Sequence, residues 1–184
     1  MGGRPILTYI DAHMKKILIV VLLLFSAASF AQAQDQLETA KKKLAAGDFT
    51  GAKADLSKIL EATPKNKIAL NLRGQARAGL DDLYGAIGDY TYALEVDSTY
   101  ADALNNRGEA KMNLGDDEGA IEDLDKALRF NPKFADAYTN RGLAKYNIED
   151  LQGAYFDFPK ALELGPAHAD KYFNRGVAKA EPGE

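Results

Sequence analysis

Charged side chains of opposite sign recur along this sequence at a fixed interval. One series places an aspartate every 34 residues, and a second places an arginine 18 residues after each aspartate. The series are Asp55, Asp89, Asp123 and Asp157, and Arg73, Arg107, Arg141 and Arg175. A carboxylate beside a guanidinium makes a charge-assisted, often two-pronged hydrogen bond, so we interpret the two series as a structural ladder of ion pairs. The alternative is an anion site lined by the four arginines, but matched opposite charges more often neutralise each other.

The ends of the two series indicate how the charges pair. The first 34-residue unit has Thr39 where an arginine would fall, and the last arginine, Arg175, is followed by no aspartate of the series. Pairing inside a unit leaves Asp55 and Arg175 alone, whereas pairing from one unit to the next leaves none alone. We therefore predict pairs that cross between units, as from Asp89 to Arg107.

Residues that could assemble a catalytic site are scarce. The chain has no cysteine, and its two histidines are His13 and His168. After residue 33 the serines are Ser57 and Ser98, neither of which lies in a G-x-S-x-G motif. A nucleophile, a base and an orienting group cannot be assembled from this set. Carboxylates are so numerous that close pairs arise by chance, and we expect no enzyme activity.

Metal, cofactor and nucleic-acid sites are not expected either. The acidic pairs at Asp81-Asp82 and Asp116-Asp117 lack the spacing of a calcium-binding loop, and no glycine-rich turn from a strand to a helix is present to hold phosphates. The net charge is -4, with 23 Lys+Arg against 27 Asp+Glu. Because phosphate backbones are bound mainly by Lys and Arg, this charge argues against nucleic acid as a partner.

The interval of 34 residues belongs to the whole sequence and indicates the elements that position these charges. Glycine recurs at 74, 108, 142 and 176, Gly-Ala at 51, 85, 119 and 153, and Ala-Leu or Ile-Leu at 59, 93, 127 and 161. Within one period, apolar residues follow helical spacing on both sides of Gly115-Asp116. Asp116 suits the N-cap of a second helix and Pro132 ends it. Each unit is therefore predicted to be a helix hairpin.

These marks resemble the tetratricopeptide repeat, which has this length, glycine at its eighth position, alanine at positions 20 and 27 and proline at position 32. The resemblance covers residues 33–66, 67–100, 101–134 and 135–168 and a partial unit, 169–181. It implies an all-α fold, an α-solenoid of antiparallel helix hairpins with four 34-residue repeats and a C-terminal capping helix, in a domain spanning residues 34–184. The last helix is either such a cap or one end of a longer array. Pro159 falls inside a second helix, which we expect it to kink.

In this family, one stripe of each first helix lines the concave face of the superhelix, so the resemblance assigns a binding groove. Positions 2, 5, 9 and 12 share that stripe. The candidate binding residues are Asn71, Gln75, Asp102, Asn105, Glu109, Met112, Asp136, Thr139, Leu143 and Tyr146. The clamp that chaperone adaptors of this family use for acidic tails needs Lys or Arg at positions 2 and 6, where this chain has Asp102, Asp136 and Asp170, and Asn106, Asn140 and Asn174. We therefore expect a basic or amide-rich protein partner.

Residues 14–33 have the build of a bacterial secretory signal peptide. Lys15 and Lys16 precede an unbroken apolar run, and Ala31-Gln32-Ala33 suits cleavage after Ala33. Residues 1–13 are interpreted as a leader upstream of a true start at Met14. Because the apolar segment is shorter than the roughly 20 residues that span a bilayer, we expect an exported periplasmic or secreted product, with membrane association only if the segment is retained.

Two functions fit this reading. The first is a protein–protein interaction scaffold of the bacterial cell envelope that binds a partner segment in its groove. The alternative is a structural or self-associating repeat array that forms one end of a longer envelope assembly.

Overall fold

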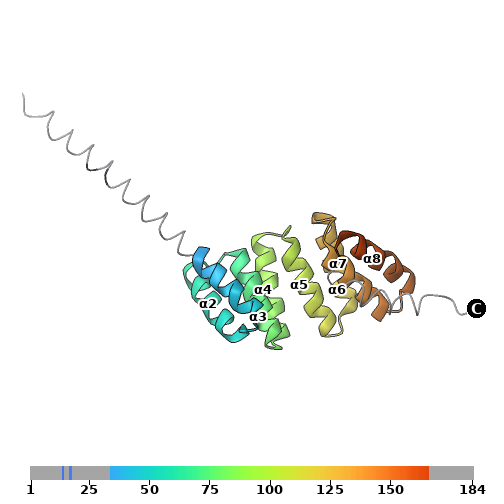
Figure 1. The fold of residues 1–184 in the computed structure, drawn as a ribbon, viewed down its shortest axis with the longest axis horizontal. Helices are drawn as coiled ribbons and strands as arrows, with labels where there is room; N and C mark the ends of the chain where they lie inside the picture. The colour runs from blue at the N-terminus through green and yellow to red at the C-terminus, as the bar shows by residue number, and fades with distance from the viewer. Residues whose placement is uncertain (1–13, 15–16, 18–33, 166–184) are drawn as a thin grey trace, which may run out of the picture. The chain divides into compact units, whose positions relative to one another are not determined.

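The structure is a computed structural model that describes Met14, Ile17 and residues 34–165. Within residues 34–165 the chain forms eight helices and no strand. A helix over residues 34–45 precedes seven labelled helices (Figure 1): α2 (Phe49–Ala62), α3 (Lys67–Gly79), α4 (Leu83–Val96), α5 (Ala101–Asn113), α6 (Asp117–Phe130), α7 (Ala135–Asn147) and α8 (Leu151–Leu164). The predicted all-α fold is confirmed.

The chain divides into two compact units, residues 1–39 and residues 40–184. In the first unit, the Thr39 hydroxyl donates a hydrogen bond to the backbone oxygen of Asp35 at 2.9 Å. In the second unit, α3 packs on α4, α5 on α6 and α7 on α8, and each second helix also packs on the first helix of the next pair. The first helices contact one another as well, α3 with α5 and α5 with α7.

Every second helix of the described part begins at an aspartate cap, as predicted for Asp116. The caps are Asp48, Asp82, Asp116 and Asp150, and each accepts the N–H of the glycine three residues later at 2.9–3.0 Å. These glycines begin the Gly-Ala series. A Cβ atom on any of them would lie 2.1–2.3 Å from the capping carboxylate. The series is therefore kept by the helix caps, and not by close approach of packed helices as the sequence pattern suggests.

The glycines at position 8 of each repeat do mark close approach between the helices of a pair. A Cβ on Gly74 would lie 2.4 Å from the ring of Tyr90, and one on Gly142 would lie 2.7 Å from the ring of Phe158. At Gly108 the nearest atom is Cγ of Leu124, at 3.0 Å. The large side chains that fill these sites are almost completely buried, so each hairpin has its own core.

Pro159 lies inside α8, which runs from Leu151 to Leu164 without a break. The kink expected there stays a prediction. The signal segment other than Met14 and Ile17, both histidines, Arg175 and the partial unit 169–181 lie outside the described residues. No helix in the described part of the chain combines the length and hydropathy needed to cross a bilayer.

Candidate functional site

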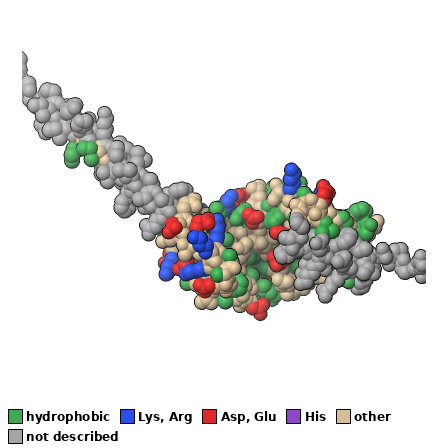
Figure 2. Space-filling model, viewed as in Figure 1, with side chains coloured by type: hydrophobic (Ala, Val, Ile, Leu, Met, Phe, Trp, Pro, Cys, Tyr) green, Lys and Arg blue, Asp and Glu red, His purple; other side chains and the backbone are tan. Residues whose placement is uncertain are grey.

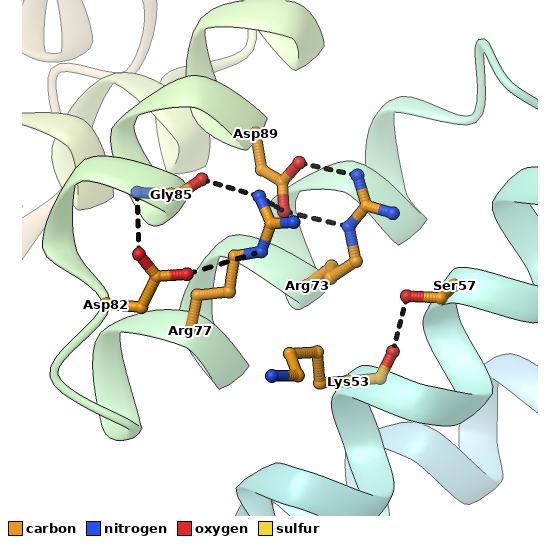
Figure 3. A network of polar contacts seen from close by, with 7 residues as sticks. All are labelled: Lys53, Ser57, Arg73, Arg77, Asp82, Gly85 and Asp89. Carbon is orange, nitrogen blue, oxygen red and sulfur yellow. Dashed lines mark hydrogen bonds and ion pairs between the residues drawn. The ribbon is translucent and has the colours of Figure 1, made fainter.

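The arginines and aspartates of the ladder pair within repeats, so the prediction of pairs between repeats was wrong. Arg73 donates from Nε and Nη2 to the two oxygens of Asp89 at 2.8 and 2.6 Å (Figure 3). Arg107 holds Asp123 in the same way at 2.8 and 2.7 Å, and Arg141 holds Asp157 at 2.8 and 2.5 Å. Each pair joins the first and second helices of one hairpin. Arg175 lies outside the described residues.

A second cation, which the sequence analysis missed, completes each pair. It lies four residues after the arginine position, on the same face of the first helix. The bonds run from Lys43 to Asp55 at 2.5 Å, from Arg77 to Asp89 at 3.1 Å, from Lys111 to Asp123 at 2.9 Å and from Lys145 to Asp157 at 2.8 Å. Asp55 is therefore not stranded by the lack of an arginine at Thr39. The premise of the offset pairing fails because Lys43 takes that role.

The carboxylate of Asp123 shows the electrostatic balance of the ladder. Burial alone would raise its pKa, but hydrogen bonds and positive charge from Arg107 and Lys111 outweigh burial and lower the pKa below its ordinary value. The side chain of Asp123 is only 1% exposed. Because the arginines are occupied by buried carboxylates, the ladder is structural and the described arginines line no anion site.

Connections between repeats use other atoms of the same arginines. Arg107 donates from Nη1 to the hydroxyl of Thr91 at 3.1 Å, and Arg141 donates from Nη1 to Asp125 at 2.6 Å. Thr91 and Asp125 occupy the same position in the second helices of successive repeats. Each of these arginines therefore binds its own hairpin with one edge and the preceding hairpin with the other.

A second connection between repeats is made by asparagines of the first helices. Asn106 donates from Nδ2 to Oδ1 of Asn71 at 3.0 Å, and Asn140 donates from Nδ2 to Oδ1 of Asn105 at 3.1 Å. We call these four residues the asparagine ladder. Asn71 and Asn105 are 3% and 5% exposed. Both were predicted to line the groove as partner contacts, but their amides are used in these bonds across repeats.

A pocket of about 400 Å³ lies on the concave stripe between α5 and α7. Six of the predicted groove residues line it: Asn105, Glu109, Met112, Asp136, Thr139 and Leu143. Three asparagines that the stripe did not include complete the lining, Asn106, Asn113 and Asn140. Position 6, occupied by Asn106 and Asn140, was considered only for its lack of a cation. Its place beside position 5 on the helix could have indicated that it borders the groove.

The other predicted groove residues lie outside this pocket. Asp102 is exposed on α5, Gln75 is half-buried on α3 and Tyr146 is half-buried on α7. Asn71 is buried in the asparagine ladder. The structure thus gathers the candidates from the third and fourth repeats into one cavity, and their role in binding stays a prediction.

The pocket is negative in character, because two carboxylates and no Lys or Arg side chain line it. Loss of water around the carboxyl group of Glu109, and then the nearby negative charge of Asp136, raise the pKa of Glu109. On the face shown in Figure 2, Lys and Arg gather around α2, at the other end of the row of helices from α8. Across the described residues, no group of three His, Asp or Glu side chains is placed to hold a metal ion.

The fold and its groove define the class as an α-solenoid built from helix hairpins. Family profiles identify the hairpins: one described as "Tetratricopeptide repeat" matches residues 37–99, and one described as "TPR repeat" matches residues 110–148. The chain belongs to the tetratricopeptide repeat family. No curated protein sequence matches it.

Solved structures give the same fold. TTC0263, a thermophilic TPR protein of Thermus thermophilus, is 19% identical with a TM-score of 0.74, over 81% of this chain and 83% of that one. MamA is 26% identical with a TM-score of 0.63, over 77% of this chain and 94% of that one. The first TPR of Spaghetti (RPAP3), solved bound to the HSP90 peptide SRMEEVD, is 24% identical with a TM-score of 0.60, over 63% of this chain and 94% of that one.

Proposed function

We propose that this chain is a protein–protein interaction scaffold that binds a segment of a partner protein along the concave face of its first helices. The observation that carries the proposal is the pocket between α5 and α7, where predicted groove residues form one cavity. The related TPR structure solved with a bound HSP90 peptide supports a peptide-binding role for the fold. No enzyme activity is part of the proposal.

The partner segment that fits this groove is basic or amide-rich. The peptide bound to the related TPR protein, SRMEEVD, carries three acidic residues. Glu109 and Asp136 in the pocket, with Asp102 exposed on the same stripe, would repel such a peptide. Asparagine amides beside these carboxylates can pair with backbone or amide groups of a partner. We place this interaction in the bacterial cell envelope, on the strength of the signal-like residues 14–33.

The proposal is tested by capturing partners from an envelope extract and measuring their binding kinetics with purified protein. Asp102→Lys combined with Asp136→Lys should slow association and flatten its salt dependence, because exposed charges mainly steer encounters. Tyr146→Ala should speed dissociation, because aromatic contacts carry much of the affinity. Both effects require binding on the stripe of the first helices.

The matched control reverses charges on the second helices, where Glu122 and Lys126 are exposed on α6. Glu122→Lys with Lys126→Glu should leave both rate constants unchanged. Binding that is slowed by this pair, while the groove variants capture the partner as fast as wild type at low salt, would place the interaction on the other face and overturn the proposal.

A further inference from the structure

The pocket between α5 and α7 contrasts with the buried or half-buried carboxylates of the charge ladder. Asp55, Asp89, Asp123 and Asp157 each have one or two cations within 3.1 Å. Within residues 34–165, neither Glu109 nor Asp136 has an ion pair. Two negative charges from different helices thus face one cavity without a compensating cation in the described part of the chain.

The shape of the cavity suits one long side chain. About 400 Å³ is near the lower end of the roughly 300–1,000 Å³ of ligand pockets, which leaves no room for a folded element. Met112, one turn after Glu109, and Leu143, one turn after Thr139, add an apolar wall, and both are half-buried. Long cationic side chains bury their methylene groups on such walls while their charged ends stay with polar groups.

We propose that this pocket binds the side chain of a single arginine or lysine of the partner segment. The charged end lies between Glu109 and Asp136, and the methylene groups pack on Met112 and Leu143. This inference rests on the proposed function, since it names the part of the partner that the groove recognises. It predicts specificity for cationic residues at one point of the bound segment.

The asparagine ladder prepares the walls of the pocket for this ligand. Asn140 is held by Asn105 across the two repeats, and Asn105 donates in turn to Asn106 at 3.3 Å. These bonds fix the distance between the helices that bear the two carboxylates. A site whose walls are ordered before binding loses less conformational entropy when the ligand enters.

The test uses short alanine-based peptides, blocked at both ends, that differ only at the central residue. The residues compared are arginine, lysine, their uncharged analogues citrulline and norleucine, and glutamate. NMR titration of the full chain reports affinity and place together. We expect the arginine or lysine peptide, or both, to shift the signals of Glu109, Met112 and Leu143 and to bind about tenfold more tightly than its uncharged analogue. The stronger of the two identifies the preferred side chain. Equal binding of charged and uncharged peptides overturns the proposal.

Paired variants locate the effect. Glu109→Gln with Asp136→Asn should abolish the preference for charge, whereas Glu118→Gln with Glu122→Gln removes two carboxylates of α6 outside the pocket and should leave it intact. Thermal unfolding of each variant verifies that it is folded. If both pairs weaken cationic peptides equally, the attraction comes from the general charge of the protein and the pocket assignment is wrong.

Failure of this inference can be told apart from failure of the proposed function. A captured partner that depends on Leu143, as tested by Leu143→Glu, but binds equally to wild type and Glu109→Gln with Asp136→Asn, leaves the groove function standing and refutes the cation subsite. Light scattering covers another occupant. If copies of the chain associate and the same double variant separates them, a second copy fills the pocket, and assignment to a separate partner is wrong.

Discussion

Removing one member of the buried pair between Arg107 and Asp123 should destabilise the fold far more than removing both. The Asp123 side chain is 1% exposed and receives three bonds, at 2.8 and 2.7 Å from Arg107 and at 2.9 Å from Lys111. Arg107→Ala leaves a buried carboxylate with one cation. Breaking a buried pair in this way costs about 3–5 kcal/mol, and because Lys111 remains we expect about 3 kcal/mol.

The double variant Arg107→Ala with Asp123→Ala has no buried charge left without its partner. Its loss of stability should fall short of the sum of the two single losses by about 2–3 kcal/mol, within the range for residues in contact. Urea unfolding of wild type, both single variants and the double variant at neutral pH gives this interaction energy. The matched control is the cycle of Arg107 with Asp89, which is held by Arg73 and Arg77 and should be additive within about 0.5 kcal/mol.

Acid should reduce the effect of Arg107→Ala. The pKa of Asp123 in the folded protein is lowered, so its ionised form contributes stability that is present above the unfolded pKa of about 3.9 and is lost as pH falls through the folded value. In the variant, burial persists with one cation fewer, so the pKa rises and protonation relieves the buried charge. The difference from wild type should therefore shrink below about pH 4. A larger interaction energy for Arg107 with Asp89 than with Asp123, or a difference that grows in acid, would refute pairing within repeats.

Three further outcomes follow from single sites. Gly74→Ala places a Cβ 2.4 Å from the Tyr90 ring and should cost about 1–3 kcal/mol in urea unfolding; Tyr90→Leu should recover part of that cost, and no recovery would contradict the assigned clash. Pro159→Ala restores a backbone donor inside α8 and should raise the melting temperature, gaining up to about 3 kcal/mol; a lower melting temperature would mean that the ring packs favourably. Glu109→Gln removes a carboxylate whose pKa is raised by desolvation and by Asp136, so its charged form disfavours the fold at neutral pH and the melting temperature should stay equal or rise; a clear fall would assign Glu109 a stabilising role.

The hairpins could be predicted from the sequence because the same physical requirement recurs in each repeat. Asp116 caps its helix through the N–H of the glycine three residues later, and Gly108 stands where the helices of a pair approach. Such requirements are local, so the chain shows them as fixed spacings. The sequence also suggested a close-approach role for Gly119, where the atom in the way is the capping carboxylate of Asp116. Spacing alone does not distinguish these two causes.

The partners in the charge ladder were mispredicted because a periodic sequence offers two registers. An aspartate lies 16 residues after one arginine and 18 before another, and the period supports both. The turn decides between them. Arg73 and Asp89 are equidistant from Asp81, which has a positive φ of 63° at the turn, and residues equidistant from the turn lie opposite each other in an antiparallel hairpin. The recurrence of Lys43, Arg77, Lys111 and Lys145 carried the same information.

The asparagine ladder could not be predicted in the same way. Helical projection places Asn71 and Asn105 on the concave stripe, but whether an amide reaches the next repeat depends on the rotation between hairpins. That rotation is set by packing of whole helices, such as α4 on α5 and α5 on α7, and no single spacing records it. Residues predicted to contact a partner thus became contacts between repeats, while Asn106 and Asn140 came to the pocket wall.

Positions that repeat and positions that vary divide the work of this protein. The carboxylates of the charge ladder and the capping aspartates are the same in every described repeat, as a common hairpin requires. The groove positions that face each other between successive first helices differ at each step: Gln75 with Asp102, then Glu109 with Asp136. Only the second combination places two carboxylates in one cavity of the described chain. Since the fold does not require that combination, and the raised pKa of Glu109 shows that it opposes folding at neutral pH, its retention is best explained by a cationic partner.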